Sequence, residues 1–430
     1  MVSPIDDLQD NQYNNSSMTL NNSRFRNFII GLLLLVLGGV VGYRLQPKTD
    51  GQSKLPIFEL KNTSQPQEFK QVDFKQFWEV WAILKKDYLD QEKLNDDKMV
   101  QGAIGGMTSA LEDPYTLYLP PEEQKRSVED LQGSFFGVGI QLGYIDNTVA
   151  VIAPIKGGPA AAKGVMAGDL ILHVKDEAKS LDKDTTGWSL NEAVNNIRGD
   201  KGTEVTLTLF RKDNGKQPFE VTIARDEIVV PTVELNYVEK NSHKVAHIVL
   251  SRFGEKTTAE LDAIISDILI NRPQIDGIVL DLRNNPGGFF DGAIEIASEF
   301  IEDGVVVSQK SKAQQQDYKA LGNARLSNIP IIVLVNRGSA SASEIVAGAL
   351  RDRKQAKLVG ERSFGKGTVQ DARQLDNGAG LHVTVARWLL PSGAWIHDEG
   401  IPVDVEVKDD PNTPEDEVVF KAIEEFSVQK

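Results

Sequence analysis

The sequence contains no cysteine, which excludes disulfide bonds, thiolate zinc sites and cysteine nucleophiles. It has only five histidines, so a histidine-based catalytic triad has few positions available. The net charge is -15, and no stretch is rich in Lys and Arg. Because nucleic-acid binding rests on positive charge that meets phosphates, we expect no nucleic-acid partner.

What is present is an ordinary globular composition. Of the 430 residues, 40% are hydrophobic and 25% are charged. A chain of this length and composition supports two or three domains, each with a hydrophobic core of its own.

One long apolar run lies near the N-terminus. Residues 27–43 carry no charge and are rich in Leu, Ile and Val, and as a helix they would span about 25 Å, at the short end for a membrane helix. A cleaved signal peptide is the alternative, but no small-x-small cleavage signature follows the run. Arg24 and Arg26 favour a cytoplasmic N-terminus, whereas Arg44 and two later lysines oppose it. We favour an uncleaved anchor.

The rest of the chain changes character in steps. Apolar residues recur at helical spacing between Phe74 and Leu111, and the pattern closes at Asp113-Pro114. We predict six segments: a disordered Asn-rich tail at 1–26, the anchor or signal segment at 27–43, a polar linker at 44–71, a helical segment at 72–128, a β-rich domain at 129–228 and an α/β domain at 229–430.

The last two segments differ in their periodicity. Short β-type runs broken by glycines fill residues 129–228, with one helix-like run at 190–197. After about Val230, buried strand patterns alternate with helix patterns, which indicates βαβ units with right-handed crossovers. The predicted strands are 278–282, 331–335 and 357–359, and the predicted helices are 293–301 and 342–353.

Each of these three strands runs into a corner rich in Gly, Ser and Asn. The corners comprise residues 283–288, 336–344 and 360–367. In open α/β folds, active sites lie beyond the carboxyl ends of the strands, where loops meet and helix N-termini point inward. The three corners together therefore predict a site.

Ser341 has two interpretations. It fits a helix-capping box with Glu344, and it also fits a nucleophile at a helix N-terminus if a base lies nearby. Lys366 is the candidate base. Its ordinary pKa is about 10.4, so it accepts a proton at neutral pH only if burial lowers that pKa; otherwise it is a solvated loop lysine. Phe364 and two neighbouring glycines are suited to form an apolar pocket.

Two other motifs compete for these residue types. Residues 360–366 match the Gly-x4-Gly-Lys start of a P-loop, but Gly367 replaces the magnesium-binding Ser or Thr, and 368–370 continue as a strand. Residues 180–183 have the Ser-x-x-Lys spacing of β-lactamases, but they lie in a charged stretch without supporting motifs. We discount both.

The corners resemble those of the carboxyl-terminal processing (tail-specific) serine peptidases. The resemblance covers roughly residues 73–410 and includes a PDZ-like pattern. The matching segments are 113–116, 136–140, 158–169, 280–288, 338–344 and 360–370.

This resemblance implies a fold class of α/β plus β: a crotonase/Clp-like βαβ catalytic domain with an N-terminal helical segment and an inserted PDZ domain. It implies Ser341 as nucleophile and Lys366 as general base, with Gln370 orienting the lysine by a hydrogen bond. Oxyanion stabilisation would come from the backbone N–H groups of Gly287 and Ala342. We expect neither a metal ion nor a cofactor.

For other residues we expect a structural role, or leave open whether they act in catalysis. Asp352 aligns with an acidic residue implicated in some family members, and it is equally well explained as a surface helix residue. Glu344 and Arg283 are interpreted as structural, and His397 lies in a structural closing segment.

The PDZ-like domain suggests how substrates are recognised. Its loop would offer backbone N–H groups to a terminal carboxylate while the peptide adds as a β-strand, which favours cleavage near apolar C-termini. Arg198 matches an arginine that links the PDZ and catalytic domains in some relatives; compensation of the helix dipole is the alternative. The expected loop residues are Phe136, Gly137, Val138, Gly139 and Ile140.

We therefore expect a serine endopeptidase that is anchored in a bacterial inner membrane by a single pass through residues 27–43. Its catalytic part would lie in the periplasm and act on unfolded or flexible C-terminal tails. The alternative is a catalytically inactive PDZ scaffold, which the presence of both Ser341 and Lys366 disfavours. A homo-oligomer, an adaptor protein and the direction of PDZ regulation are left open.

Overall fold

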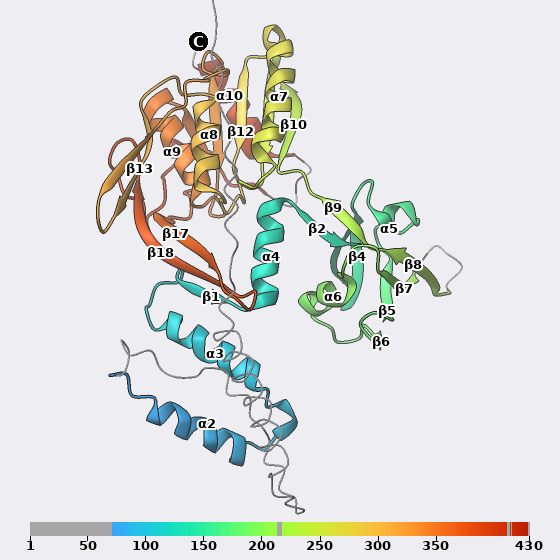
Figure 1. The fold of residues 1–430 in the computed structure, drawn as a ribbon. Helices are drawn as coiled ribbons and strands as arrows, with labels where there is room; N and C mark the ends of the chain where they lie inside the picture. Colours follow the sequence, from blue (N-terminus) through green and yellow to red (C-terminus); the bar gives the residue numbers. More distant parts are fainter. Residues whose placement is uncertain (1–70, 213–216, 411–412, 414, 429–430) are drawn as a thin grey trace, which may run out of the picture. The chain divides into compact units, whose positions relative to one another are not determined.

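The computed structural model describes residues 71–212, 217–410, 413 and 415–428 (Figure 1). The predicted tail at 1–26, the anchor at 27–43 and nearly all of the linker at 44–71 lie outside the described residues. Within the described part, no helix is long and apolar enough to span a bilayer. The chain divides into two compact units, residues 1–91 and 92–430.

In the first unit, the described structure consists mainly of helix α2 (Lys75–Asp87). Three of its aromatic rings, Phe77, Trp78 and Trp81, contact one another, with the Phe77 and Trp78 centroids 4.9 Å apart. Two lysines occupy its last turn, where they suit the negative end of the helix dipole. A 3-10 turn (Gln91–Lys93) follows at the junction of the two units.

The second unit begins with α3 (Asp96–Ser109), whose first turn is capped by the Asn95 side chain. The helices expected between Phe74 and Leu111 are thus found as α2 and α3. The segment to residue 128 is not purely helical, however, because β1 (Leu117–Leu119) pairs antiparallel with a strand of the C-terminal part. Helix α4 (Pro121–Gln132) follows and ends at Gly133 in the left-handed conformation.

A β-rich domain follows α4. Strands β2 (Ser134–Gly137) and β9 (Asp226–Val229) pair at its entrance and exit. Between them lies a six-stranded sheet with a core that includes Val151, Leu207 and Ile223. Its elements are β3 (Ile140–Ile145), β4 (Thr148–Pro154), α5 (Pro159–Ala162), β5 (Leu170–Asp176), β6 (Leu181–Asp184), α6 (Leu190–Ile197), β7 (Glu204–Phe210) and β8 (Phe219–Ala224).

The α/β part is built on a six-stranded sheet in the order β10-β11-β12-β15-β16-β19. All neighbours are parallel except the β10–β11 pair. The strands are β10 (Val233–Lys240), β11 (His243–Leu250), β12 (Gly277–Asp281), β15 (Ile331–Val335), β16 (Lys357–Gly360) and β19 (Val405–Glu406), and the helices are α7 (Thr257–Asn271), the short η3 (Arg272–Gln274), α8 (Phe290–Ser298), α9 (Ala342–Lys354) and α10 (Glu417–Val428).

Both faces of this sheet are covered. Ile278 and Leu280 of β12 pack on the side of α7, α8 and α9, whereas Val279 packs on the side of α10. Side chains that alternate between two buried faces make each central strand a continuous apolar run. The predicted strands at β12, β15 and β16 and the helix at α9 lie within a residue or two of their expected positions, and α8 starts three residues earlier.

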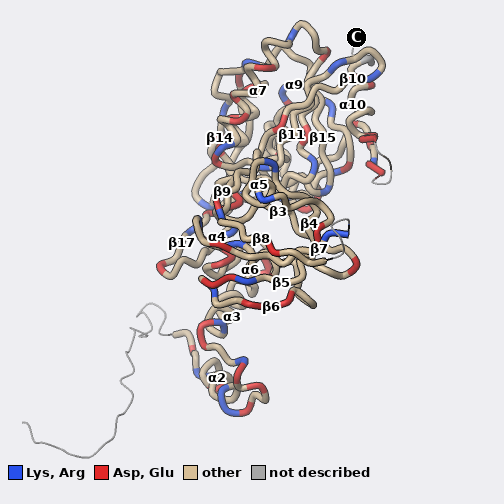
Figure 2. Tube along the Cα trace, turned by 90° about the vertical axis from the view of Figure 1, so that its right-hand side faces the viewer, with Lys and Arg blue, Asp and Glu red and all other residues tan. Residues whose placement is uncertain are grey.

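A second sheet of five strands joins β1 to four strands of the α/β part. It comprises β1, β13 (Val305–Ser311), β14 (Gln315–Lys319), β17 (Thr368–Gln374) and β18 (Gly380–Leu389). Strand β17 begins two residues after Lys366, so the segment that resembled a P-loop enters a strand and not a helix. Figure 2 shows acidic and basic residues interspersed along the visible face of the chain.

Candidate active site

Ser341 stands at the turn between β15 and α9. Its backbone dihedrals, φ 57° and ψ -115°, lie in a region that non-glycine residues rarely adopt, at a typical cost of about 1–3 kcal/mol. Such strain persists only where the surroundings hold it. Two residues earlier, the buried Ser339 hydroxyl donates to the Leu282 carbonyl at 2.7 Å and accepts from the Asn336 N–H at 2.9 Å, which ties this turn to the corner after β12.

Asn285 joins the same two corners from the other side. It is fully buried, and its amide nitrogen donates to the Leu250 carbonyl at 2.7 Å. Its own backbone carbonyl accepts from the Ala340 N–H at 3.0 Å and from the Ser343 hydroxyl at 2.8 Å. The turn that carries Ser341 is therefore held at positions on either side of the serine.

Gly287 lies directly against the serine. A Cβ atom at this position would sit 2.9 Å from both the Ala340 carbonyl oxygen and the Ser341 Cβ, and 3.1 Å from the Ala342 nitrogen. Its φ of +100° also favours glycine. The two expected oxyanion donors, Gly287 and Ala342, are thus neighbours. In this structure the Gly287 N–H donates to the Asn285 side chain at 2.9 Å.

Glu344 connects the serine corner to the lysine corner. It is fully buried, and one carboxylate oxygen, Oε2, accepts the Ser341 N–H at 2.8 Å and the Lys366 N–H at 2.9 Å. The other oxygen accepts from the Ser363 hydroxyl and the Gly365 N–H, both at 2.6 Å. Burial raises the pKa of Glu344, and these four hydrogen bonds oppose that rise.

The Lys366 side chain is largely withdrawn from water. Burial lowers its pKa below the usual lysine value, while the charges of Asp113 and Glu344 act in the opposite direction. The loop backbone around it is fixed, because the Lys366 carbonyl accepts from the Trp388 indole at 2.9 Å. A lysine with a lowered pKa on a fixed loop is a candidate general base.

The roof of the lysine pocket comes from far away in the sequence. The Lys366 ammonium nitrogen lies 5.1 Å from the centre of the Tyr115 ring, within cation–π range. This ring is placed by the turn at 113–116, in which the Asp113 carboxylate accepts from the Tyr115 N–H at 3.0 Å and the Thr116 hydroxyl at 2.7 Å. Thr116 in turn accepts the Thr384 N–H of β18 at 3.0 Å.

Tyr115 and Asn285 were not among the predicted site residues. Asp113-Pro114-Tyr115-Thr116 was noted only as part of the family resemblance, and nothing local in the sequence signals that it packs over a lysine 251 positions later. The hydrogen bonds that Asn285 forms with Leu250, Ala340 and Ser343 likewise exist only in the folded chain.

Among the described residues, Gln370 is not hydrogen-bonded to the lysine. Within the described chain its amide nitrogen donates to the hydroxyls of Thr368 at 2.9 Å and Thr384 at 3.2 Å. Asp352 accepts the Ser392 N–H at 3.0 Å, and Arg283 pairs with Asp281 and Asp416. The last two arrangements tie elements of the fold together.

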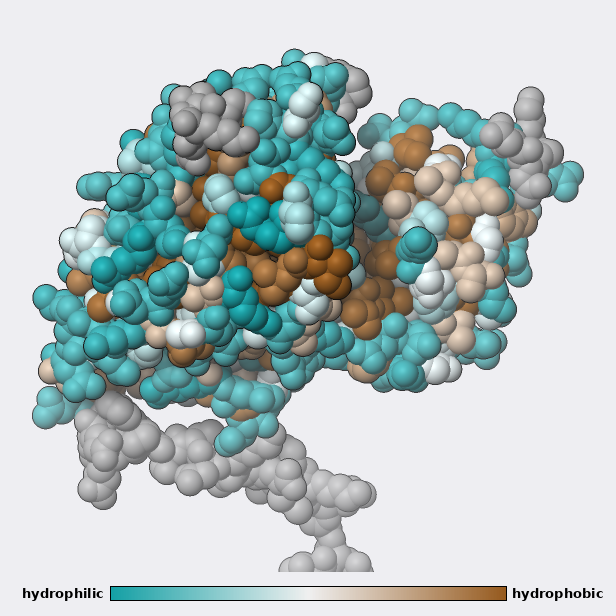
Figure 3. All heavy atoms as spheres, turned by 90° about the horizontal axis from the view of Figure 1, so that it is seen from above, coloured by the Kyte–Doolittle hydropathy of each residue, from teal (hydrophilic) through white to brown (hydrophobic). Residues whose placement is uncertain are grey.

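Around the serine, two large apolar side chains are partly exposed. Phe289 follows the Gly287-Gly288 loop and is 45% exposed, and Phe364 precedes the lysine loop and is 53% exposed. Figure 3 shows hydrophobic patches on the visible face of the described chain amid a mostly hydrophilic surface. Exposed apolar side chains beside a candidate nucleophile suit contact with an apolar peptide.

In the β-rich domain, the expected carboxylate loop is short. Phe136 and Gly137 end β2, Val138 and Gly139 form the turn, and Ile140 begins β3. The Val138 carbonyl accepts the Ala160 N–H at 2.9 Å, which fixes the turn on α5.

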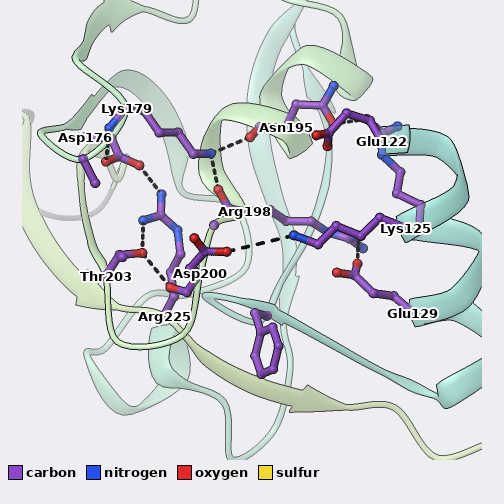
Figure 4. A pocket seen from close by; sticks show the side chains of 14 residues that line it. Glu122, Lys125, Glu129, Asp176, Lys179, Asn195, Arg198, Asp200, Thr203 and Arg225 are labelled. Carbon is purple, nitrogen blue, oxygen red and sulfur yellow. Dashed lines mark hydrogen bonds and ion pairs between the residues drawn. The ribbon is translucent and has the colours of Figure 1, made fainter. Parts of the chain in front are cut away.

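Arg198 caps the C-terminal end of α6 and reaches toward α4 (Figure 4). Its guanidinium lies over the Phe135 ring at 4.1 Å and pairs with Glu129 of α4 at 3.2 Å. It lines a cavity of about 390 Å³ together with Lys179, whose ammonium donates to carbonyls at the end of α6. Arg198 therefore contacts the helix that precedes the domain.

Comparison with known proteins agrees with this architecture. Residues 244–407 match peptidase family S41, residues 137–223 match a PDZ domain, and residues 35–123 match the N-terminal domain of the activating protease CtpB. The chain is 39% identical over 337 residues to the carboxy-terminal processing protease CtpA of Bacillus subtilis (strain 168), a match that covers 78% of this chain and 69% of that protein.

Further relatives extend the match. A probable CtpA-like serine protease of Staphylococcus aureus (strain MRSA252) is 35% identical over 406 residues, which is 93% of this chain and 75% of the relative. The solved structure of a putative S41 protease from Bacteroides fragilis shares the fold, with a TM-score of 0.52 at 14% identity and coverage of 81% and 97% of the two chains.

The chain therefore belongs to peptidase family S41, with a PDZ domain and a CtpB-like N-terminal region. The family resemblance and the fold class expected from the sequence are confirmed. Its membership makes it a serine protease by class.

Proposed function

We propose that this protein is a serine endopeptidase in which Ser341 is the nucleophile and Lys366 is the general base. The observation that carries the proposal is the shared carboxylate oxygen of Glu344, which binds the backbone N–H of both residues. Because this single buried oxygen holds the backbone of both residues, it supports a common site for the strained serine and the lysine.

The proposed reaction proceeds through an acyl-enzyme. The neutral Lys366 amine takes the proton of the Ser341 hydroxyl as the serine oxygen attacks the peptide carbonyl. The resulting ammonium gives this proton to the departing amine when the peptide C–N bond breaks. A water molecule then loses a proton to Lys366 and attacks the ester carbonyl. As the C–O bond to serine breaks, the ammonium gives this proton to the Ser341 oxygen, which restores the hydroxyl and the neutral amine.

Charge on the carbonyl oxygen would be stabilised by backbone N–H groups. Ala342 opens helix α9, where the helix dipole also favours negative charge. Gly287 is the second donor, and its N–H must exchange the Asn285 oxygen for the substrate oxygen. Gln370 keeps its amide oxygen as an acceptor with which to orient the Lys366 amine.

For substrates, we propose flexible C-terminal tails of extracytoplasmic proteins. The PDZ match and the names of the relatives support this assignment. The turn at Val138 and Gly139 would receive a terminal carboxylate, with the peptide added as a strand beside β3. Arg198 would couple the domain to α4.

We also propose a bacterial membrane anchor at residues 27–43, with the catalytic part in the periplasm. It rests on the uncharged run in the sequence.

The pair of Ser341 and Lys366, the proposed catalytic dyad, is tested with the full chain in mild detergent and an unfolded protein substrate that ends in apolar residues. Ser341→Ala and Lys366→Ala are each expected to lower the cleavage rate by at least about a thousandfold, as loss of a nucleophile or its base does in hydrolases. The matched control is the discounted Ser-x-x-Lys motif, because Ser180→Ala and Lys183→Ala change the same residue types in the PDZ domain.

Full activity in either dyad variant contradicts the assignment. Wild-type protein that binds the tail but never cleaves it would favour the scaffold alternative.

A further inference from the structure

A cavity of about 740 Å³ is lined in part by Tyr115, whose ring lies 5.1 Å from the ammonium of the candidate base. It lies between the turn at 112–115, the end of β13 and the neighbouring part of β18, and it is closed by the segment that carries Trp395 and His397. The proposed chemistry does not use this space.

One wall of the cavity is a continuous series of contacts that starts at the base. From Lys366 the series passes to the Tyr115 ring (5.1 Å), then to His397 (5.9 Å) and to Trp395, on which His397 stacks at 5.0 Å. The Arg387 guanidinium lies 4.2 Å above the Trp395 ring. The wall therefore leads from the reacting groups to a cation on β18.

Arg387 does not stand alone at this far end. It lies directly opposite Lys310 in the antiparallel β13–β18 pair, and Lys312 follows two residues later. Like charges at directly opposite positions destabilise a sheet. In the described part of the chain, no carboxylate forms an ion pair with any of these three cations. Three exposed cations without an ionic partner among the described residues are suited to bind an anionic group of a ligand.

The acidic groups of the cavity gather at the other end. Asp113 is occupied by its hydrogen bonds to the 113–116 turn, and Asp398 lies close enough to raise the pKa of Tyr115 after the larger effect of burial. Glu112 belongs to the same turn. The cavity is thus acidic beside the base and basic on β13 and β18.

We propose that this cavity binds the part of the substrate that follows the scissile bond and that it selects acidic side chains there. The inference rests on the proposed function, in which Lys366 protonates the departing amine, so the departing fragment begins beside Lys366 and Tyr115. The four contact distances together set an upper limit on the distance from the Lys366 ammonium to the Arg387 guanidinium. An extended peptide covers this length in about six residues at roughly 3.3 Å each. Asp or Glu about four to six residues beyond the cleaved bond would reach Lys310, Lys312 and Arg387.

The experiment compares two internally quenched peptides with the full-length enzyme. They share the same apolar free C-terminus and differ only at the fourth to sixth residues after the bond, which are Glu in one peptide and Gln in the other. Because the shared C-terminus is recognised equally in both, any difference reports on acidic side chains alone. We expect kcat/KM to be about fivefold higher for the Glu peptide at low ionic strength and this preference to shrink in 0.5 M salt, since the cations are exposed.

Variants then locate the preference. In Lys310→Gln/Lys312→Gln, the ratio of the two kcat/KM values should fall toward one, because Arg387 is the one cation of the three that remains. Lys319→Gln is the matched control, because Lys319 is an exposed lysine on β14 of the same sheet but outside the cavity, and it should keep the wild-type ratio.

Equal cleavage of the two peptides by the wild type overturns the subsite but leaves the peptidase proposal standing. A preference that survives undiminished in the double variant also overturns it. If neither peptide is cleaved, the proposed function fails, and fluorescence anisotropy on Ser341→Ala decides the subsite: tighter binding of the Glu peptide that the lysine substitutions remove supports it, and equal binding refutes it.

Discussion

Replacement of Glu344 by Gln tests the link between the two halves of the site. The carboxylate accepts four hydrogen bonds, two on each oxygen, and an amide offers only one oxygen. The less costly orientation keeps the amide oxygen on the N–H groups of Ser341 and Lys366. The amide nitrogen then faces Ser363, whose hydroxyl can turn to accept, and the Gly365 N–H loses its acceptor. One buried unsatisfied N–H costs about 1–3 kcal/mol, so we expect that loss in the free energy of unfolding.

The same substitution removes a negative charge beside the base. Because the charge of Glu344 raises the pKa of Lys366, its loss should lower that pKa further. Lys366 acts when deprotonated, so the rise of kcat/KM with pH should begin at lower pH in Glu344→Gln than in the wild type. Urea unfolding measures the first effect, and a pH profile with a small fluorogenic peptide measures the second.

Glu299→Gln provides the control, since Glu299 is also buried and forms an ion pair with Arg325 and a hydrogen bond with Asn323, away from the lysine. It should lose stability without moving the pH profile. A Glu344→Gln enzyme with wild-type stability and an unmoved profile would refute the reasoning.

Two further substitutions probe the walls of the site. Tyr115→Leu keeps an apolar side chain over the lysine but removes the ring that attracts the ammonium, so the rise of kcat/KM should move to lower pH. Tyr115→Ala admits water to the lysine and should move this rise to higher pH. Profiles that move in the same direction in both variants would contradict this role of the ring. Gly287→Ala places a methyl group against the Ser341 turn and should lower kcat at least about tenfold by displacing the oxyanion donors. Gly393→Ala has a similar positive φ but open space around it, so it should lose only stability; equal kcat losses in the two variants would show strain alone to be responsible.

The elements best predicted from the sequence are those whose signal lies in one continuous run of residues. Strands β12 and β15 were recognisable because burial on both faces turns each into an unbroken apolar run. Strand β18 was not predicted, because Gly380–Leu389 mixes polar and apolar residues and two of its three partner strands, β1 and β13, lie far away in the sequence. Helix α10 was also missed, although its apolar side packs on the central sheet.

At the site, Ser341 and Lys366 emerged from their motifs, but the second role of Glu344 did not. From the sequence it looked like a capping residue for α9, and it does accept the Ser341 N–H. Its hold on the lysine loop, more than 20 positions later, exists only in the folded chain. The Asn285 contact with the Gly287 N–H was equally invisible, because an oxyanion donor and a turn N–H look alike in a sequence.

The pairing of β2 with β9 has a consequence for how this protein was assembled and how it can be altered. Ser134 and Val229 are directly paired, so the PDZ domain enters and leaves the chain at neighbouring points. A module with adjacent ends can be exchanged for another of the same kind, or replaced by a short turn, without a long connection to close. The β2–β9 pair thus makes the PDZ domain a unit that can be exchanged without rebuilding the peptidase part of the chain.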